Sequence, residues 1–364
     1  MNKPYTVGLI VPTGIGAAIG GYAGDALPVA RAIAEVADRL ITHPNVLNGA
    51  QLYWNLPNAL YVEGYGLDQF AVGHWGLLPQ ASNRIGLILD RAIEPDLQLR
   101  HLQVADAARA TLGLNLTDYV VTDQPLNVEL RTAKSGATWG TIGHPDSLLR
   151  AAEKLIDQAG ATAIAVVARF PDDPSSEALQ DYRYGQGVDH LAGAEAVISH
   201  LIVRTFRVPC AHAPALSPLP IDPNLSPRSA AEELGYTFLP CVLVGLSRAP
   251  QFTEFPNAHA IWADQMNALV IPASAAGGSA ILSLSQSKTR IIAVEDNQTK
   301  LQVRPEALGI RSMIVKSYLE VIGVLICDRA GINPAALSPE ISSLRPLDRS
   351  QFLGVERPSI LSES

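Results

Sequence analysis

Residues 6–25 read TVGLIVPTGIGAAIGGYAGD, an apolar segment that runs directly into a turn rich in glycine. A helix-period pattern follows, with Asp25 as its expected N-cap and Ala26–Leu40 as its expected extent. Glycine lets the backbone take positive φ values and lets a ligand approach without a Cβ in the way. A strand, a Gly-rich turn and a helix N-terminus in this order predict a seat for an anion. We expect four glycines to form this seat, namely Gly14, Gly16, Gly20 and Gly21.

The same turn departs from the dinucleotide fingerprint G-x-G-x-x-G, because Ile19 stands where the third glycine is required. The next predicted strand, Arg39–Thr42, ends in Thr42 and His43 instead of the acidic residue that would bind ribose hydroxyls. These departures argue against NAD and leave the cofactor unknown. Two interpretations stay open, a clamp for a phosphate, carboxylate or nucleotide, and a turn that only packs a helix against its strand.

The composition excludes several classes of protein. The chain has 364 residues, of which 48% are hydrophobic and 17% charged, and a net charge of -8. Because nucleic acids and anionic membranes attract basic surfaces, we expect neither as a partner. The three cysteines, Cys210, Cys241 and Cys327, form no CxxC motif, which is typical of a reducing compartment and argues against a disulfide framework. We expect a soluble, intracellular protein that binds a small molecule, and a homo-oligomer is compatible with the sequence.

Strand-length apolar runs alternate with helix-period stretches along most of the chain. This pattern predicts an α/β protein with mostly parallel sheets and crossover helices in Rossmann-like layers. We expect two lobes, at 1–170 and 188–335, and a loosely packed tail at 336–364. Further strands are predicted at Ile85–Leu89, Tyr119–Thr122, Ala161–Ala168, Phe238–Gly245, Ala268–Ile271 and Arg290–Val294. Further helices are predicted at Leu97–Leu112, Pro145–Gln158, Ala192–Thr205, Ala230–Leu234 and Ser312–Ala330.

Two segments interrupt this alternation. Residues 171–187 are polar and rich in turn formers, and residues 214–227 contain five prolines. Proline removes a backbone donor, so the second segment is expected to form neither a helix nor a central strand. Each segment is either a connection between lobes or a long surface excursion near a site.

A second Gly-rich turn follows the predicted strand Ala268–Ile271 and reads PASAAGGSA at 272–280. Its backbone N–H groups and serine hydroxyls predict a second anion seat, with a simple helix cap as the alternative. The binding residues would be Gly277, Gly278 and Ser279. The strand after it ends in Glu295-Asp296-Asn297, which adds Asn297 as a ligand-binding candidate.

Polar residues also follow several other predicted strands, where open α/β sheets bind ligands. Asp123, His144 and Glu295 are the candidate acids and bases. Arg169 is the candidate for bidentate binding of a carboxylate or phosphate, and Asn45 is a further ligand-binding candidate. The alternative is that these residues only cap helices and turns.

Histidines and the cysteine beside one of them give further candidates. Cys210 and His212 could form a nucleophile and its base or half of a metal site, or could pack in a loop. Asp189 is expected to cap the helix that carries Glu195, and His200 on that helix is expected to be a packed histidine. A metal-dependent hydrolase would require three of the following histidines and nearby carboxylates to converge: His43, His144, His190 and His212.

Five longer motifs carry a family resemblance. They are PTGIGAAIGGYAGDALP at 12–28, HPNVLN at 43–48, LYVEGYGLD at 60–68, SGATWGTIGHPDSLL at 135–149 and FLPCVLVGLSRAPQF at 238–252. With them the chain resembles, over nearly its whole length, an uncharacterised family of cyanobacterial and plastid proteins known only as a domain of unknown function. The resemblance implies the cyanobacterial cytosol or the chloroplast stroma and supplies no activity.

The sequence therefore predicts an enzyme for a small anionic metabolite, which is phosphorylated, nucleotide-linked or a carboxylate. The ligand would lie in a cleft between the two Gly-rich turns, and the reaction would be transfer or hydrolysis. Two alternatives remain, a non-catalytic metabolite-binding or scaffold protein of photosynthetic cells and the metal-dependent hydrolase. Convergence of Asp123, His144, Arg169 and Glu295 in one pocket would favour the enzyme.

Overall fold

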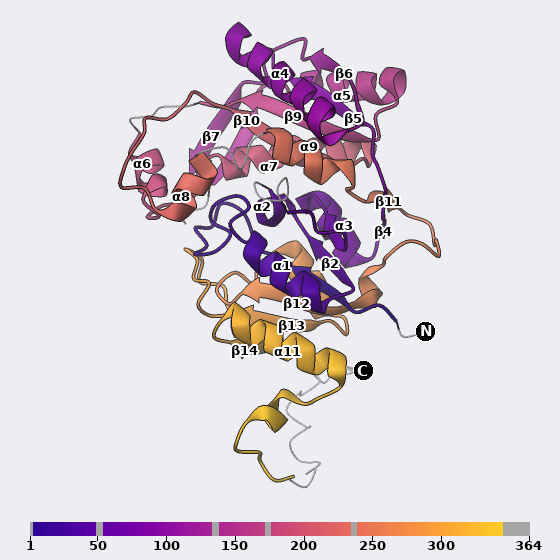
Figure 1. Ribbon diagram of the computed structural model, residues 1–364, viewed down its shortest axis with the longest axis vertical. Coiled ribbons are helices and arrows are strands. Elements are labelled where there is room, and N and C mark those ends of the chain that lie inside the picture. Colours follow the sequence, from indigo (N-terminus) through magenta and orange to yellow (C-terminus); the bar gives the residue numbers. More distant parts are fainter. Residues whose placement is uncertain (1–2, 49–53, 133–137, 172–175, 234–238, 345–364) are drawn as a thin grey trace, which may run out of the picture.

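The computed structural model describes residues 3–48, 54–132, 138–171, 176–233 and 239–344. It contains two parallel sheets with helices packed against them, one sheet above the other in Figure 1. The expected α/β class with Rossmann-like layers is confirmed.

The larger sheet has six strands, and every neighbouring pair is parallel. Across the sheet they are β14 (Ser312–Val315), β13 (Arg290–Val294), β12 (Met266–Pro272), β1 (Thr6–Leu9), β2 (Arg39–Thr42) and β3 (Ala59–Tyr61). Counted along the chain from β3, the order is 3-2-1-4-5-6, that of doubly wound dinucleotide-binding sheets. The direction of winding therefore reverses between β1 and β12, the position at which such sheets bind ligands.

Four helices cover the two faces of this sheet. On one face lie α1 (Leu27–Val36) and α11 (Tyr318–Ala330), and on the other lie α3 (Gly64–Val72) and α10 (Ser279–Ser285). Helix α1 buries an apolar face at i, i+3, i+6 and i+7 spacing, while its Pro28 lies in the first turn, where a proline costs no hydrogen bond.

The smaller sheet has four parallel strands and lies in the upper half of Figure 1. In order they are β10 (Cys210–Ala215), β9 (Ala163–Arg169), β5 (Ile85–Leu89) and β6 (Leu116–Val121). Helices α4 (Pro95–Leu112) and α9 (Leu239–Ser247) cover one face, and α5 (Pro145–Ala159) and α7 (Ala192–Phe206) cover the other. Pro214 is tolerated in β10 because this strand lies at the edge of the sheet.

In the sequence, the strands of the smaller sheet are inserted between β3 and β12 of the larger sheet. The chain leaves the larger sheet after β3, builds the whole smaller sheet and returns at β12. The ranges 1–170 and 188–335, which were expected to be the two lobes, therefore each contribute strands to both sheets. Local sequence patterns do not show this, because pairing between β1 and β12 is a long-range property.

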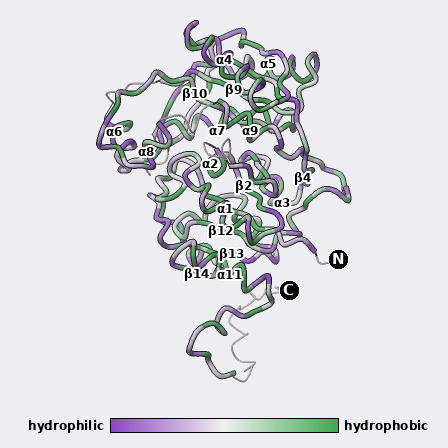
Figure 2. The backbone as a smooth tube through the Cα atoms, in the orientation of Figure 1, coloured by the Kyte–Doolittle hydropathy of each residue, from purple (hydrophilic) through white to green (hydrophobic). Residues whose placement is uncertain are grey.

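Two predicted elements differ from the structure. The predicted strand Phe238–Gly245 is wrong over its described residues, which belong to helix α9 (Leu239–Ser247). The apolar residues of α9 are buried against β5, β9 and β10, and Phe238 lies outside the described residues. A helix that is apolar on most sides has no periodicity that distinguishes it from a buried strand, and Figure 2 colours α9 hydrophobic along most of its length. The predicted helix Ser312–Ala330 begins instead as strand β14, and the helix starts only after Ser317, whose hydroxyl accepts the N–H of Glu320.

Short elements complete the described part of the chain. The antiparallel pairs are β4 (Gly76–Leu78) with β11 (Gln251–Thr253) and β7 (Val128–Thr132) with β8 (Thr138–Ile142). Helix α2 (Pro44–Leu47) lies between the sheets, and α6 (Glu177–Arg183) and α8 (Pro227–Ala231) lie together at the left of Figure 1. The expected tail is described as far as residue 344 and exposes Leu337, Ile341 and Leu344.

Candidate functional site

A cavity of about 800 Å³ lies between the two sheets. The larger sheet contributes residues that follow β1, β2 and β3, and the smaller sheet contributes residues of α4, α7, β10 and α9. The remaining wall comes from α6, α8 and the loops beside them, so the two excursions noticed in the sequence border this cavity. Its ionisable lining residues are His43, Glu63, Arg100, His101, Tyr22, Tyr182, Arg183, Asp189, His190, Glu195, His200, His212, Asp222, Glu232 and Glu233.

A glutamate and a histidine from different sheets meet at this cavity. Glu63 follows β3 and caps α3, where its Oε2 accepts the N–H groups of Tyr65 at 2.8 Å and Gly66 at 3.2 Å. Its Oε1 lies 2.6 Å from Nδ1 of His200, which is on α7. The Glu63 side chain is 4% exposed and that of His200 is 41% exposed, so a buried carboxylate holds an accessible imidazole.

The surroundings of this Glu63–His200 pair affect the protonation of the imidazole. Burial lowers the pKa of His200, but the close contact with Glu63 and the negative charge of that carboxylate outweigh burial, and the net pKa is raised. Gly64 permits the close approach, because a Cβ at this position would lie 3.0 Å from Cε1 of His200. The pair therefore joins α3, which packs on the larger sheet, to α7, which packs on the smaller sheet, and its close contact depends on the absence of a side chain at Gly64.

A second histidine, His212 on β10, lies beside the carboxylate of Glu195, which is on the same helix as His200. Nδ1 of His212 on β10 is 3.2 Å from the hydroxyl of Ser199, and its Nε2 is 3.8 Å from the Glu195 carboxylate. Ser199 and Glu195 are one helical turn apart on α7 and therefore lie on the same face of the helix as each other. This arrangement holds His212 in place more loosely than Glu63 holds His200.

Three carboxyl groups influence one another in the cavity. Burial and then the charge of Glu195 raise the pKa of Asp189 to about 7. Burial, followed by the charge of Asp189, raises the pKa of Glu232 well above its ordinary value. Carboxyl groups in this situation can keep a proton near neutral pH and can donate it to a ligand. Asp189 accepts the N–H of Leu191 at 2.9 Å, but Leu191 and not Asp189 is the N-cap residue of α7, so the expected capping of this helix by Asp189 is not seen.

His43 is neutral in this site. It lines the cavity after β2, its Nε2 accepts the N–H of Val11 at 3.1 Å, and burial lowers its pKa to about 4. Asn45, two residues on, donates from Nδ2 to the carbonyl groups of Val11 at 3.1 Å and Gly20 at 2.8 Å. Asn45 is thus both a cavity residue and a support of the Gly-rich turn.

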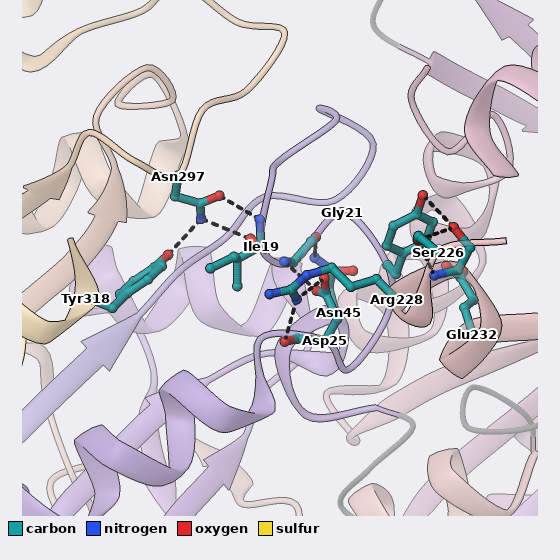
Figure 3. A network of polar contacts seen from close by, with 12 residues as sticks. Ile19, Gly21, Asp25, Asn45, Ser226, Arg228, Glu232, Asn297 and Tyr318 are labelled. Carbon is teal, nitrogen blue, oxygen red and sulfur yellow. Dashed lines mark hydrogen bonds and ion pairs between the residues drawn. The ribbon is translucent and has the colours of Figure 1, made fainter. Parts of the chain in front are cut away.

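The two Gly-rich turns follow adjacent strands but lie against a segment of their own chain. Residues 297–303 contact both turns, since Ala18 donates to Gln298, Lys300 donates to Ile15, and Ala276 donates to Val303. Asn297 binds Ile19 from both ends of its amide, at 2.8 and 2.9 Å, as Figure 3 shows. A Cβ on Gly16 would lie 2.9 Å from the Lys300 side chain, and one on Gly277 would lie 3.2 Å from Val303.

The glycines at the two turns therefore serve close approach within the protein. Several N–H groups expected to bind an anion already have protein acceptors, as in Ile19 with Asn297 and Gly20 with Asp25. Of the residues predicted to bind a ligand, Asn45 lines the cavity. The others lie outside its lining, and they are Gly14, Gly16, Gly20, Gly21, Arg169, Gly277, Gly278, Ser279 and Asn297.

The predicted acids and bases do not meet in one pocket. Asp123 binds Arg150 at 2.7 and 2.8 Å, and this partner lowers the pKa of the half-exposed Asp123 carboxyl. His144 contacts the carbonyl of Pro125 at 2.7 Å, and Glu295 pairs with Arg304 at 3.1 Å beside the other sheet. Arg169 bonds Glu94 at the carboxyl edge of the smaller sheet. None of these four residues lines the cavity.

Sequence reasoning missed the residues that do meet. His200 was expected to be a packed histidine, and Glu63 entered only as part of the motif LYVEGYGLD at 60–68. Their partnership joins residues 137 positions apart, which is why no local spacing indicates it. One local signal does exist, since Glu63 precedes Gly64-Tyr65-Gly66 as the N-cap of α3 and is fixed there by two N–H groups.

The metal and thiol alternatives receive no geometric support from the described residues. His43, His190 and His212 line the cavity and His144 does not, and in the described part of the chain no three His, Cys, Asp or Glu side chains are arranged to hold a metal ion. Cys210 lies in strand β10, where burial raises the pKa of its thiol well above the ordinary value. A thiol in this state is a poor nucleophile.

The comparisons with known proteins identify a family without an assigned activity. The profile of the DUF3326 family, described as proteins of unknown function, matches residues 6–338. The chain belongs to this family. It is 60% identical over 352 residues to a protein of Synechococcus sp. named an uncharacterized lipoprotein, and the match covers 96% of this chain and 98% of that protein. No solved structure matches the chain significantly.

The family resemblance seen in the sequence is thereby confirmed. Helices long and apolar enough to cross a membrane are absent from the described residues.

Proposed function

We propose that this protein is an enzyme that binds a small polar molecule in the cavity between its sheets and acts on it by general acid–base catalysis. The observation that carries the proposal is the Glu63–His200 pair, a buried carboxylate 2.6 Å from an imidazole that is accessible in the cavity. A carboxylate that fixes one ring nitrogen orients the imidazole and stabilises its charged form, which is the arrangement used by catalytic histidines.

The chemistry follows from the two ring nitrogens. Glu63 engages Nδ1, so Nε2 is the atom through which His200 would take a proton from a ligand or return one. The carboxyl groups of Asp189 and Glu232 supply protons from the same cavity, since burial and the charge of a neighbouring carboxylate, Glu195 for Asp189 and Asp189 for Glu232, raise the pKa of each. An acid and a base in one cavity support transfer or hydrolysis, the reaction classes that the sequence predicted.

The charges in the cavity bear on the ligand. An anionic metabolite was expected because of the Gly-rich turns, which here contact residues 297–303. The cavity instead presents carboxylates, and of its two arginines Arg183 is bound by Glu233 at 2.7 and 3.1 Å. These groups favour a ligand with several hydrogen-bond donors, such as hydroxyl or amino groups, over one whose only polar feature is negative charge.

The test is turnover of defined metabolite mixtures followed by NMR. Purified protein is incubated with pools of polyols, sugars, amino acids, amines and organic phosphates, and the consumption of any component is measured. We expect His200→Gln and Glu63→Gln to lower the rate on the converted compound by about 10²–10⁴-fold, the usual contribution of a general acid or base. His74→Gln is the matched control, because His74 is exposed and pairs only with Gln69 at 3.0 Å.

Two outcomes would overturn the proposal. Equal turnover by wild type, His200→Gln and His74→Gln would remove His200 from the chemistry. A compound that binds, raises the melting temperature and is never converted would instead support the non-catalytic metabolite-binding protein. Saturation at about 100 times Kd should add roughly 2.7 kcal/mol of stability, which a thermal shift detects.

The proposal places the protein in the cytosol or the chloroplast stroma. Its support is the sparse cysteine content, since the chain has three cysteines without a CxxC motif and all three are buried. The name of the Synechococcus relative suggests the contrary for that protein, namely attachment to a membrane through lipid. Detergent phase separation of a cell lysate decides between the two, and recovery in the detergent phase would refute the cytosolic location.

A further inference from the structure

One wall of the cavity is held almost entirely by polar contacts. It consists of residues 176–190, which include α6, and residues 217–233, which include α8, and these residues are called the lid below. All of them are described, and the only buried side chains among them are the polar ones of Arg183 and Ser229. Since buried apolar area supplies most local stability, a segment without it opens at low cost.

The two parts of the lid are joined to each other. Arg183 of α6 binds Glu233 at 2.7 and 3.1 Å and donates to the carbonyl of Pro220 at 2.8 Å. Ser229 of α8 donates to the carbonyl of Arg183 at 2.7 Å. Because these bonds run within the lid, α6 and α8 can move together without losing them.

A separate set of bonds fastens the lid to the first Gly-rich turn, which follows β1 of the larger sheet. Arg228 binds the Asp25 carboxylate at 2.8 Å, and the hydroxyl of Tyr182 lies 3.0 Å from the carbonyl of Gly21. The hydroxyl of Tyr22 donates to the carbonyl of Tyr182 at 2.9 Å. Figure 3 shows Arg228 reaching from α8 to Asp25, beside Asn45 and Gly21.

The first Gly-rich turn, on which the lid rests, is held more firmly than the lid. Asn45 and Asn297 bind the carbonyl groups of Gly20 and Ile19, and Tyr318 in turn binds Asn297 at 2.7 Å. At Gly16 the lid approaches the backbone of the turn closely, since the carbonyl of Gly187 lies 3.0 Å from where a Gly16 Cβ would be.

We propose that α6 and α8 form a lid that opens as one unit and controls access to the cavity, and that the Gly-rich turn is the seat on which it closes. The ion pair between Arg228 and Asp25 is its latch. The regulated site is the one under Proposed function, but the lid itself requires only the cavity. Opening breaks the bonds to the turn and leaves the core of both lobes intact, which is the behaviour of gating loops in enzymes.

The test measures how fast a reagent enters the cavity. Ala196 lines the cavity on α7, and the native cysteines are buried, so Ala196→Cys places a reporter thiol behind the lid. We expect N-ethylmaleimide to label this thiol slowly in the closed protein. Adding Arg228→Ala should raise the labelling rate about three- to tenfold, the effect of losing one charge-assisted hydrogen bond in a two-state opening. Arg228→Lys should give a smaller rise.

The matched control is Arg150→Ala, which removes an ion pair to Asp123 outside the lid that is of similar length and has a similarly exposed arginine, although Asp123 is more exposed than Asp25. It should leave the labelling rate unchanged. The proposal fails if Arg228→Ala and Arg150→Ala label alike, or if labelling shows the full denaturant dependence of global unfolding. The readout involves no substrate, so a protein without turnover can still have this lid, and an active one can lack it.

Discussion

The cavity has two walls that are built in opposite ways. The wall formed by α7 and β10 carries Glu195, His200 and His212, and its other faces are buried against the smaller sheet through residues such as Ile198 and Ile202. The lid buries no apolar side chain in its described residues and is fastened by hydroxyls, carbonyls, one ion pair and the contact of the Tyr182 ring with the Tyr22 ring. His200, which needs a fixed geometry for the proposed chemistry, thus lies on the wall that cannot open cheaply, whereas the proton donors Asp189 and Glu232 belong to the lid and move with it.

This difference predicts a large contrast between one mutation in each wall. Ile202→Ala in α7 removes a fully buried side chain from the core and should lower the free energy of unfolding by about 2–5 kcal/mol. Leu179→Ala in α6 removes a half-buried side chain and should cost under about 1 kcal/mol. Urea denaturation of the two variants measures both. Equal costs would mean that the lid is part of the cooperative core.

The sequence predicted the layers of the fold because they are local in origin. The run TVGLIV before the Gly-rich turn and the apolar face of Ala30, Ile33 and Ala34 lead to β1 and α1 without reference to the rest of the chain. The insertion of one sheet into the other could not be predicted, since it depends on β1 pairing with β12, more than 250 residues away. Helix α9 could not be predicted for another reason, since nearly all of its residues are apolar and buried, so the sequence shows no helical alternation of apolar and polar residues.

The site was less predictable than the fold for a related reason. Polar residues at strand ends were expected to converge, but Asp123 and Arg169 instead pair with nearby charges, Arg150 and Glu94. The two interruptions at 171–187 and 214–227 were expected to be either connections between lobes or surface excursions near a site, and residues of both line the cavity. His200 could not be singled out because its partner Glu63 comes from the other lobe, and only the packing of the lobes brings them together.

A second contrast concerns the seat of the lid. Gly20 and Gly73 have nearly the same backbone angle, with φ of 88° and 85°, but differ in the space around them. A Cβ on Gly20 would lie 2.6 Å from Val11, whereas one on Gly73 meets nothing within 4 Å. Gly73→Ala should cost about 1 kcal/mol for the left-handed backbone alone, and Gly20→Ala should cost about 1–3 kcal/mol more because of the clash. Thermal or urea unfolding of the pair measures the difference, and a flexible turn would show none.

The proton chemistry of the cavity gives a third test, through Asp189→Asn. The pKa of Asp189 is raised to about 7. The stability that this group contributes is therefore fully present below the ordinary aspartate pKa and is lost as the pH rises through about 7. Above that pH the folded protein carries a carboxylate that burial and Glu195 both disfavour. Asparagine keeps an acceptor for the N–H of Leu191 and removes the charge. The variant should therefore come nearest to wild type near pH 3.5 and be more stable than wild type near pH 8.5, by up to about 4 kcal/mol.

Unfolding curves at the two pH values check this sign. A variant that is less stable than wild type at pH 8.5 would show that the carboxylate is favoured in its charged form, and that a cationic partner outweighs burial. The proton donor assigned to the cavity would then have to be Glu232 alone.

The smallest expected effect separates the lid from the rest of the molecule. Arg228→Ala should lower the free energy of global unfolding by under about 1.5 kcal/mol, since the pair is half exposed on the arginine side. If Arg228 releases Asp25 whenever the lid opens, the labelling rate behind the lid should rise by the factor that corresponds to this same free energy. Arg150→Ala should change global stability by its own small amount and leave labelling untouched. Agreement of the two quantities for Arg228, together with their disagreement for Arg150, would show that the latch is broken in the open lid while both sheets remain folded.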